Sequence, residues 1–467
     1  MEANSSLVAT NHVVLFPFMS KGHTIPILNL ARLLLRRRGI TVTVFTTPGN
    51  LPFVSNFLSD TDASIISIPF PQNIPEIPSG VESTDKLPSI SLFVPFCWAT
   101  KQMQPDFERE LQSLPPVSFM VSDGFLWWTQ ESASKFGFPR LVFYGLSGYA
   151  YSVSRAVREH LLLLGSESED ELITVTPFPW IGITKRDFEP TFLNPEHKGA
   201  GLELFIDQVL STSNSYGMIV NSFYEMEQTF VDYCNQKDQV KLWCVGPLCL
   251  AKPIKLAKNE PKPSWIQWLD GKLEAGCSVL YVAFGSQAEI SAEQLKEIAK
   301  GLEESKVNFL WVIRKTESEL GDGFEERLKN RGIVVRQWVD QWEILMHQSV
   351  QGFLSHCGLN SVLESICAAV PILAWPMIAE QPLNARMVSE EIKVGLRVDM
   401  CDGKVRGFVK SEGLKKMVKE LMEGETGKEV KKKVKEVAEM ANKALKEGSG
   451  SSWLTLDLLI KELGNKN

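Results

Sequence analysis

The sequence predicts an α/β protein with two doubly wound domains that face each other across a cleft. Three observations lead to this fold class. The chain has 467 residues, more than one ordinary hydrophobic core accommodates. Short apolar, β-branched runs alternate with longer stretches of helical period in both halves. These runs are continuously apolar rather than alternating, which is typical of parallel strands covered by helices on both faces.

The first half contains six such runs. They are residues 13–18, 41–47, 64–70, 119–123, 141–144 and 218–222. Helical patterns lie between them, for example over residues 25–38 and 127–136. We predict that the runs form the parallel sheet of an N-terminal domain over residues 1–245.

The stretch GPLCLAKPIKLAKNEPKP, residues 246–263, is rich in Pro and Lys and has no clear period, which predicts a linker. Beyond it six further runs follow, at residues 278–285, 309–313, 332–339, 350–355, 371–376 and 394–399. We predict a C-terminal domain over residues 264–450. The Lys/Glu-rich segment 424–447 indicates a helix with one solvated face. Residues 451–467 predict a last helix that packs back on the N-terminal domain.

Composition narrows the class of protein. The chain is 44% apolar and 22% charged, with a net charge of −7, so charge gives no reason to expect a nucleic-acid partner. We find no basic and apolar leader and no run of about 18 apolar residues, so neither a secretory signal nor a spanning helix is expected. The eight cysteines include no CxxC pair and indicate free thiols. We expect a cytoplasmic monomer.

Polar side chains crowd at one strand-to-helix junction, FLSHCGLNSVLES, residues 353–365. A helix start offers unpaired N–H groups and a positive dipole end, and Gly358 allows close backbone approach. Asn360 and Glu364 lie one turn apart, about 5–6 Å, on one helix face. Such a pair suits a diphosphate and the diol of its ribose. A helix cap with a surface Glu is the simpler alternative for the stretch alone.

Two other strand ends carry similar groups. Trp338 to Gln341 follows one predicted strand, and Trp375 to Gln381 follows another. A tryptophan offers a face for stacking a base, and the acid–amide pair Glu380–Gln381 suits sugar hydroxyls. Because ligands of open α/β sheets bind beyond the carboxyl ends of the strands, the three strand ends predict one site for a base, a diphosphate and a sugar.

Residues 338–381 resemble the signature box of the plant secondary-product UDP-glycosyltransferases, with its W, Q, H, HCG, NS, E, P and EQ positions in order. The likeness extends to GHTIP near the start, FGS at 284–286 and WIQWLD at 265–270. It implies a GT-B type fold of two Rossmann-like domains. It also implies contacts to the donor. The base would be held by Trp338, Val339 and Gln341, and the pyrophosphate by Ser286, His356, Asn360 and Ser361. The ribose would be held by Glu364, and the sugar by Leu359, Glu380 and Gln381.

Two positions depart from the family pattern. Leu359 stands where the family usually has Trp, and Asp340 where it usually has Pro. If residue 359 contacts the sugar through its backbone N–H, Leu is tolerable; if an indole also packs on the sugar, the choice of donor changes. Gln381 matches the pattern associated with UDP-glucose.

Transfer to a hydroxyl needs a group that removes its proton. His23 follows the first strand and opens a helix, and imidazole is a base near neutral pH. Asp123 ends another strand of the same sheet and could fix the tautomer of that ring. Taken alone, His23 could be a helix-capping donor and Asp123 a turn residue. The family resemblance, in which a matching His and Asp form a dyad, favours the catalytic reading.

No cofactor is expected. Asp60-Thr61-Asp62 is the one Asp-x-Asp pair considered for a metal, but it precedes a strand, so we interpret it as a surface turn away from the cleft. The chain has no GxGxxG after its first strand and no GxxxxGK[ST] loop. Gly145–Tyr149 is not a GxSxG elbow, and Ser147, like Ala379, is instead expected to line the sugar or acceptor site.

The sequence therefore predicts an inverting enzyme that moves a hexose, glucose, from a UDP-sugar to a hydroxyl of a small phenolic or flavonoid-like acceptor. The alternative is a non-catalytic protein on the same scaffold that binds UDP-sugar or a partner. The aromatic stretches 91–98 and 124–128 indicate a flat apolar acceptor, unless they belong to the core.

Overall fold

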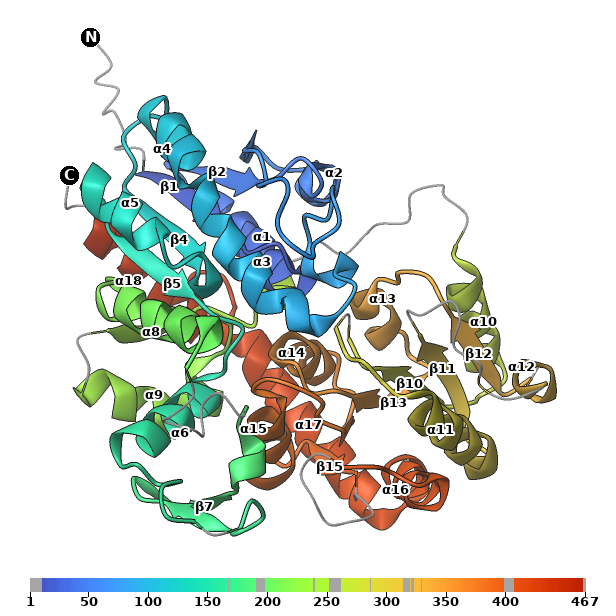
Figure 1. Ribbon diagram of the computed structural model, residues 1–467. Coiled ribbons are helices and arrows are strands. Elements are labelled where there is room, and N and C mark those ends of the chain that lie inside the picture. The colour runs from blue at the N-terminus through green and yellow to red at the C-terminus, as the bar shows by residue number, and fades with distance from the viewer. Residues whose placement is uncertain are drawn as a thin grey trace.

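The computed structural model describes residues 11–166, 168–189, 198–237, 240–251, 262–285, 287–313, 320, 323–328, 330–398 and 407–464. Two parallel sheets, each covered by helices, organise the chain (Figure 1). The predicted fold class, two doubly wound Rossmann-like sheets, is confirmed. Residues 252–261, the middle of the predicted linker, lie outside the described residues.

The N-terminal sheet has seven parallel strands in the order β3-β2-β1-β4-β5-β8-β9. The strands are β1 (Asn11–Phe16), β2 (Ile40–Thr46), β3 (Ser64–Ser67), β4 (Phe119–Asp123), β5 (Arg140–Phe143), β8 (Gly217–Val220) and β9 (Lys241–Cys244). The short edge strand β9 was not predicted. Because β1 and β4 are neighbours, their carboxyl ends lie side by side.

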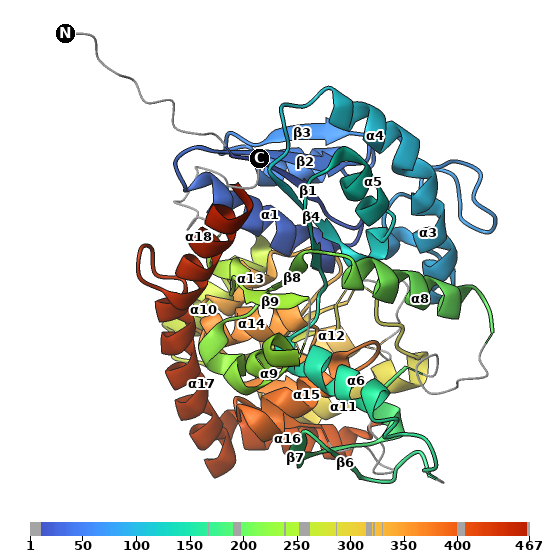
Figure 2. The ribbon, with the colours of Figure 1, turned by 90° about the vertical axis from the view of Figure 1, so that its left-hand side faces the viewer.

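The helices of this half cover both faces of the sheet (Figure 2). They are α1 (Lys21–Leu35), α2 (Leu51–Phe57), α3 (Phe93–Ala99), α4 (Gln104–Gln112), α5 (Thr129–Phe136), α6 (Gly148–Glu159), α8 (Ala200–Ser213) and α9 (Tyr224–Lys237). An antiparallel hairpin of β6 (Ile173–Val175) and β7 (Phe178–Ile183) follows α6 and was not predicted.

The C-terminal sheet has six parallel strands in the order β12-β11-β10-β13-β14-β15. They are β10 (Val279–Ala283), β11 (Asn308–Val312), β12 (Gly332–Val335), β13 (Val350–Ser355), β14 (Ile372–Ala374) and β15 (Gly395–Arg397). The helices are α10 (Ser264–Glu274), α11 (Ala292–Ser305), α12 (Phe324–Arg327), α13 (Gln341–Leu345), α14 (Leu359–Cys367), α15 (Gln381–Arg386), α16 (Ser411–Glu423), α17 (Glu425–Ala444) and α18 (Ser451–Gly464).

The Lys/Glu-rich helix α17 has one charged, solvated face and buries the opposite face. A stripe that includes Val430, Val434, Val437 and Ala441 is buried, with the charged residues on the other face. The chain then turns into α18, whose Trp453, Leu456, Leu459 and Leu463 join the core of the N-terminal sheet. The guanidinium of Arg37, just after α1, lies over the Trp453 ring, 3.8 Å from its centroid, and Arg37 Nε donates to Asp457 Oδ1 over 2.6 Å. Helix α18 therefore fastens the end of the chain to α1.

One apolar cluster is shared by the two halves of the protein. It joins residues of α6 and the β6–β7 hairpin to residues of α14, α15 and α17. Within this interface Arg386 Nη2 lies 3.0 Å from Asp187 Oδ2, and both side chains are nearly inaccessible. The first half of α6 and the hairpin are thus packed on the C-terminal half, which fixes the spacing of the two sheets.

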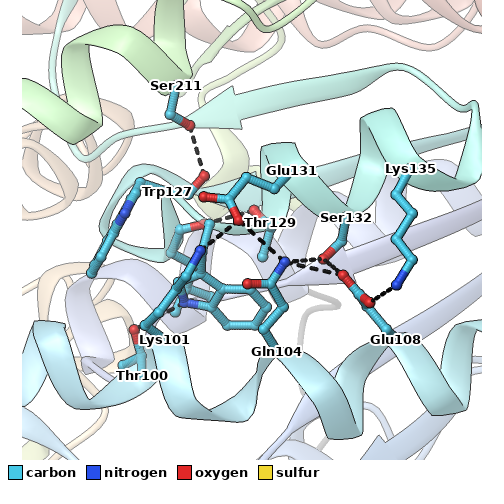
Figure 3. A network of polar contacts seen from close by, with 12 residues as sticks. Thr100, Lys101, Gln104, Glu108, Trp127, Thr129, Glu131, Ser132, Lys135 and Ser211 are labelled. Carbon is cyan, nitrogen blue, oxygen red and sulfur yellow. Dashed lines mark hydrogen bonds and ion pairs between the residues drawn. The ribbon is translucent and has the colours of Figure 1, made fainter.

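A polar network holds the segment that follows β4 (Figure 3). Gln104 on α4 donates to Glu108 Oε1 over 3.0 Å and to Ser132 Oγ over 3.2 Å, and Ser132 donates to Glu108 over 2.9 Å. Ser211 on α8 donates to the Trp127 carbonyl over 2.9 Å. These contacts connect α4, α5 and α8 around the turn after Asp123.

A buried carboxylate caps the start of α6. Glu227 on α9 is 1% exposed, and its Oε2 accepts a hydrogen bond from the Tyr149 N–H over 2.6 Å. Burial raises the pKa of Glu227 from its ordinary 4.5 to about 6. No side chain fits at Gly148, because a Cβ there would lie 2.7 Å from Glu227 Oε2.

This carboxylate gives the first prediction. The folded protein binds the extra proton between pH 4.5 and 6, because the folded pKa of Glu227 lies above the ordinary value. The free energy of unfolding should therefore fall by about 2 kcal/mol as pH rises through that interval. Urea unfolding at several pH values should show this component in the wild-type protein and not in Glu227→Gln. The exposed neighbour variant Glu225→Gln should keep it. Equal slopes in wild type and Glu227→Gln would contradict the assignment.

Candidate active site

A cleft of about 2120 Å³ separates the two sheets and is lined by residues from both halves of the chain. It lies beyond the carboxyl ends of the strands, where open α/β sheets bind their ligands. Of the predicted donor residues, ten line it: Trp338, Val339, Gln341, His356, Leu359, Asn360, Ser361, Glu364, Glu380 and Gln381. Ala379 also lines it, and Ser286 lies outside the described residues.

The structure brings His23 and Asp123 together. His23 lies in the first turn of α1, and Asp123 is the last residue of the neighbouring strand β4. The ring Nδ1–H donates to Asp123 Oδ2 over 2.7 Å, while Asp123 Oδ1 accepts the Phe125 N–H over 2.9 Å. The Asp123 side chain has no exposure and that of His23 is 21% exposed. Because Nδ1 is hydrogen-bonded to Asp123, Nε2 is the ring nitrogen of His23 that faces the cleft, close to Gly145.

The environment of His23 sets its basicity. Burial alone would lower the pKa of His23, but the charge and hydrogen bond of Asp123, with a contribution from Glu380, raise it above the ordinary 6.5. The ring is therefore a stronger base than a free imidazole. Phe125 and Phe18 contact it edge-on, with ring centroids 5.4 and 5.9 Å away.

Arg140, which the sequence analysis missed, lies beneath the dyad. Its side chain is 1% exposed, and its Nη2 donates to the Asp123 carbonyl over 3.2 Å. Its other donors reach hydroxyl groups of Ser122, Ser211 and Ser215 over 2.6–3.0 Å. The buried guanidinium group of Arg140 therefore fixes the backbone at Asp123. No local pattern marks Arg140, because it stands at the start of an ordinary apolar strand.

The His356 ring is enclosed by two glycines at the start of α14. A Cβ on Gly285 would lie 2.6 Å from His356 Nε2, and one on Gly358 would lie 2.8 Å from the same atom. Gly285 also has φ +76°, a conformation that favours glycine. Only backbone can approach the ring here. The imidazole therefore lies at the N-terminus of α14, where this helix borders the cleft.

Gln341, Ser361 and Glu364 form a connected group across α13 and α14. Gln341 Nε2 donates to Ser361 Oγ over 2.9 Å and to Glu364 Oε2 over 2.6 Å. The amide therefore orients the carboxylate that the sequence assigned to the ribose. Trp338, three residues before Gln341, is 53% exposed on the same side of the cleft and presents its ring to solvent.

Asn360 differs from expectation. The resemblance implied a pyrophosphate ligand, but the side-chain Nδ2 donates to the Gly22 carbonyl over 2.5 Å, and Oδ1 accepts from Asn221 Nδ2 over 3.0 Å. Both partners belong to the N-terminal half, and Gly22 directly precedes His23. The amide thus bridges the two halves beside the dyad. Asn221 was not singled out, because nothing in its local pattern indicates this partner.

The side chain of Leu359 points into the interior. It is 2% exposed and belongs to the apolar cluster shared by the two halves, with Val362 and Leu383. Of the two alternatives for this position, the structure favours contact with a ligand through the backbone, because the apolar side chain is already packed.

This placement yields a second prediction. Leu359→Trp should lower the free energy of unfolding by about 1–3 kcal/mol, because extra volume must enter a filled core. Leu359→Met, which conserves volume, should cost less than about 1.5 kcal/mol. The ranking of UDP-glucose, UDP-galactose and UDP-xylose as donors should be the same in all three proteins, as measured by product mass in competition. A reordered ranking in Leu359→Trp would show that the side chain reaches the donor.

The loop after β14 closes on itself and on the opposite half. Gln381 Oε1 accepts the N–H groups of Met377 and Ile378, each over 3.0 Å, which leaves the amide nitrogen toward the cleft. Burial, with Glu189 nearby, raises the pKa of Glu380 to about 7. Ala379 donates its N–H to Glu189 Oε1 over 2.7 Å. Glu189 lies in the N-terminal half and was missed, since no motif surrounds it.

Two expectations need correction. Ser147 is fully buried; it caps α6 by accepting the Ala150 N–H over 3.0 Å and donates to Asn384 Oδ1 over 3.2 Å, so its hydroxyl does not line the cleft. Asp60 was placed away from the cleft, but the turn after α2 brings it to the rim, where it accepts from Arg32 Nη2 over 2.5 Å. In the part of the chain that the structure covers, no group of three or more His, Cys, Asp or Glu residues is arranged to hold a metal ion.

The aromatic stretches divide between pocket and core. Phe93, Val94 and Phe125 line the cleft near His23, whereas Phe96 and Trp128 are fully buried. Some residues of these stretches therefore line the cleft, and others belong to the hydrophobic core. None of the described helices is long and apolar enough to span a bilayer.

Comparison with known proteins adds independent findings. Residues 255–439 match the family model described as UDP-glucoronosyl and UDP-glucosyl transferase. The chain is 61% identical over 462 residues to UDP-glycosyltransferase 90A1 of Arabidopsis thaliana, covering 97% of this chain and 96% of that one. It is 56% identical to UDP-glycosyltransferase 90A2 of the same plant, covering 97% and 98%.

Solved structures agree. Glycyrrhiza uralensis UGT73P12, complexed with glycyrrhetinic acid 3-O-monoglucuronide, superposes with a TM-score of 0.85 at 30% identity, covering 98% of this chain and 96% of that chain. Phytolacca americana UGT2, with UDP-2fluoro-glucose and pterostilbene, gives 0.81 at 27% identity, covering 97% and 100%. Medicago truncatula UGT71G1, with UDP-glucose, gives 0.80 at 25% identity, covering 97% and 98%.

Proposed function

Since this chain belongs to the plant UDP-glycosyltransferase family and is a UDP-dependent sugar transferase, we propose that it moves glucose from UDP-glucose to a hydroxyl of a small phenolic acceptor, with inversion at the anomeric carbon. The observation that carries this proposal is the His23–Asp123 pair at 2.7 Å, with Nε2 directed to the cleft. The non-catalytic alternative rested on Leu359, whose side chain lies in the core and leaves the cleft surface unchanged.

The reaction follows from this geometry. Nε2 of His23 takes the proton of the acceptor hydroxyl as the oxygen attacks the anomeric carbon, and the bond from that carbon to the UDP oxygen breaks. Asp123 stabilises the imidazolium through Nδ1 and holds the ring in the required tautomer. Because Asp123 is directed at His23, it is not placed to attack the sugar. A single displacement therefore inverts the anomeric carbon.

The donor is held by the C-terminal half. Trp338 stacks on uracil, and Glu364, oriented by Gln341, accepts both ribose hydroxyls. The N–H groups at the start of α14 and His356 receive the diphosphate and stabilise the negative charge of the leaving UDP. Glu380 and Gln381 bind the hexose. We propose no metal, because these groups supply the positive potential that a metal would provide; activity should survive dialysis against a chelator.

The acceptor side is apolar around the base. Phe93 and Phe125 give flat walls beside His23, which suits a phenolic ring. A relative bound to pterostilbene, a phenol, supports this choice. The seven cysteines that the structure describes are all free thiols, which supports a cytoplasmic enzyme.

One experiment tests this proposal. Purified protein is incubated with UDP-glucose, UDP-galactose or UDP-xylose and a set of phenols, and products are identified by mass and by the proton coupling constant at the anomeric carbon. We expect β-glucosides of at least some phenols, because the donor is α-linked. An α-linked product, or donor hydrolysis without transfer in every combination, would contradict the proposal.

A further inference from the structure

Residues of α6 and of α8 line one part of the cleft, which we call the arm. Its two walls differ in character. On α6 the residues that line the arm are Tyr151, Ser154, Arg155, Arg158 and Glu159. The α8 wall is mainly apolar, with Leu204, Phe205 and Val209. One wall thus carries hydroxyls, two cations and a carboxylate that accepts from Arg155, and the other wall is a hydrophobic surface.

The arm has a defined length. It begins at Gly145, where a Cβ would lie 3.9 Å from His23 Nε2, just before α6 starts at Gly148. It ends where the Arg158 guanidinium lies over the Phe205 ring, 5.6 Å from its centroid, and joins the two walls. Ten residues of helix separate Gly148 from Arg158, a rise of about 15 Å. The stretch of α6 that lines the arm is therefore about 15 Å long, with His23 near its start and the Arg158 guanidinium near its end.

The two arginines of this wall differ in their partners. Arg155 is buried, and its Nε donates to Glu159 Oε1 over 2.7 Å. Arg158 is exposed, and among the residues that the structure describes no carboxylate lies within ion-pair distance of it. An exposed arginine is commonly just solvated, but Arg158 faces the cleft and is anchored over an aromatic ring there. Its charge is available to a ligand in the arm.

We propose that the acceptor carries an anionic group, a carboxylate, at the end of the arm opposite to the hydroxyl that receives the sugar, and that Arg158 binds this group. The inference rests on the proposed function and specifies its acceptor. A guanidinium presents a planar pair of donors that matches the two oxygens of a carboxylate. The flat body of the acceptor lies against the apolar α8 wall, and its reactive hydroxyl meets His23 at the other end.

The test compares matched acids and esters of two lengths. The long pair is 7-hydroxyflavone with a carboxylate at its 4′ position and the methyl ester of that acid, which spans the arm. The short pair is 4-hydroxybenzoate and its methyl ester, which cannot reach Arg158 from His23. For each acceptor, kcat/KM is measured with UDP-glucose in wild type, Arg158→Gln, Arg158→Lys and the exposed control Arg38→Gln. Circular dichroism checks that all four proteins are folded.

We expect wild type to favour the long acid over its ester by about tenfold, the scale of one charge-assisted contact at a solvated site. Arg158→Gln should abolish that preference by lowering kcat/KM for the acid, with the ester changed less than about twofold. Arg158→Lys should keep part of it, Arg38→Gln all of it, and the short pair should be insensitive to residue 158.

Other outcomes are equally decisive. An acid-to-ester ratio that is the same in wild type and Arg158→Gln, while the ester is still glucosylated, overturns this inference and leaves the proposed function standing. An equal fall for acid and ester also overturns it, since that result assigns Arg158 to the shape of the arm. If wild type glucosylates none of these four acceptors and no other phenol, the proposed function itself fails, and the inference falls with it.

Discussion

Replacing His23 by alanine is expected to lower kcat about a thousandfold and to change KM for UDP-glucose only a few-fold. General-base catalysis contributes about 10²–10⁴-fold, and His23 is the group that we assign to take the proton. The donor contacts lie in the opposite half of the chain and remain. Steady-state rates of glucoside formation give both constants. The control His160→Ala removes an exposed imidazole outside the cleft and should behave as wild type. A kcat within tenfold of wild type in His23→Ala would exclude His23 as the base.

The pH dependence of the same reaction tests the role of Asp123. In wild type kcat/KM should rise with pH through an apparent pKa above 6.5, because Asp123 and Glu380 outweigh burial and raise the pKa of His23. In Asp123→Asn the rate should fall about a hundredfold or more, since the tautomer is no longer fixed. The acid limb should also move to lower pH, because the charge that favours imidazolium is gone. A lower rate with an unmoved acid limb would assign Asp123 a structural role only.

The second large effect is expected at the donor. Glu364→Ala should weaken binding of UDP about 10–100-fold, because a carboxylate oriented by Gln341 accepts two hydrogen bonds from the ribose diol, each charge-assisted. Isothermal titration with UDP measures the loss. The exposed control Glu425→Gln on α17 should leave the affinity unchanged.

A modified nucleotide isolates this contact. Wild type should bind 2′,3′-dideoxy-UDP about as weakly as Glu364→Ala binds UDP, and the variant should no longer distinguish the two nucleotides. If Glu364→Ala still prefers UDP over the dideoxy compound by the wild-type factor, the diol is bound elsewhere.

Features that depend on the local sequence pattern could be predicted from the sequence. Continuous apolar runs indicated both parallel sheets, and the rule that ligands bind beyond strand ends placed His23 and Asp123 at one edge, where β1 and β4 are indeed neighbours. The donor residues 338–381 lie close together along the chain, so their types and spacing could be recognised. The hairpin β6–β7 and strand β9 were missed; the longer strand of the hairpin, β7, contains Pro179 and Gly182, residues that are uncommon inside strands.

Features that depend on packing between distant segments were not accessible. Glu189 contacts Ala379 and Asn221 contacts Asn360, in each case from the other half of the chain, and Arg140 contacts the backbone of Asp123 from the neighbouring strand. Arg140 stands in an ordinary apolar run, and no motif marks Glu189 or Asn221. Ser147 was misplaced for the same reason, since its partner Asn384 belongs to the other half of the chain. The contacts of Ser147, Glu189 and Asn221 depend on how the two halves of the chain pack against each other.

The central claim is that His23 meets the acceptor hydroxyl while the opposite wall holds UDP-sugar. A crystal structure with UDP and a phenolic acceptor tests it most directly. We predict that the acceptor hydroxyl lies within about 2.6–3.2 Å of His23 Nε2, with uracil stacked on Trp338. A reactive hydroxyl bound beyond hydrogen-bond reach of that nitrogen, with UDP correctly seated, would contradict the account.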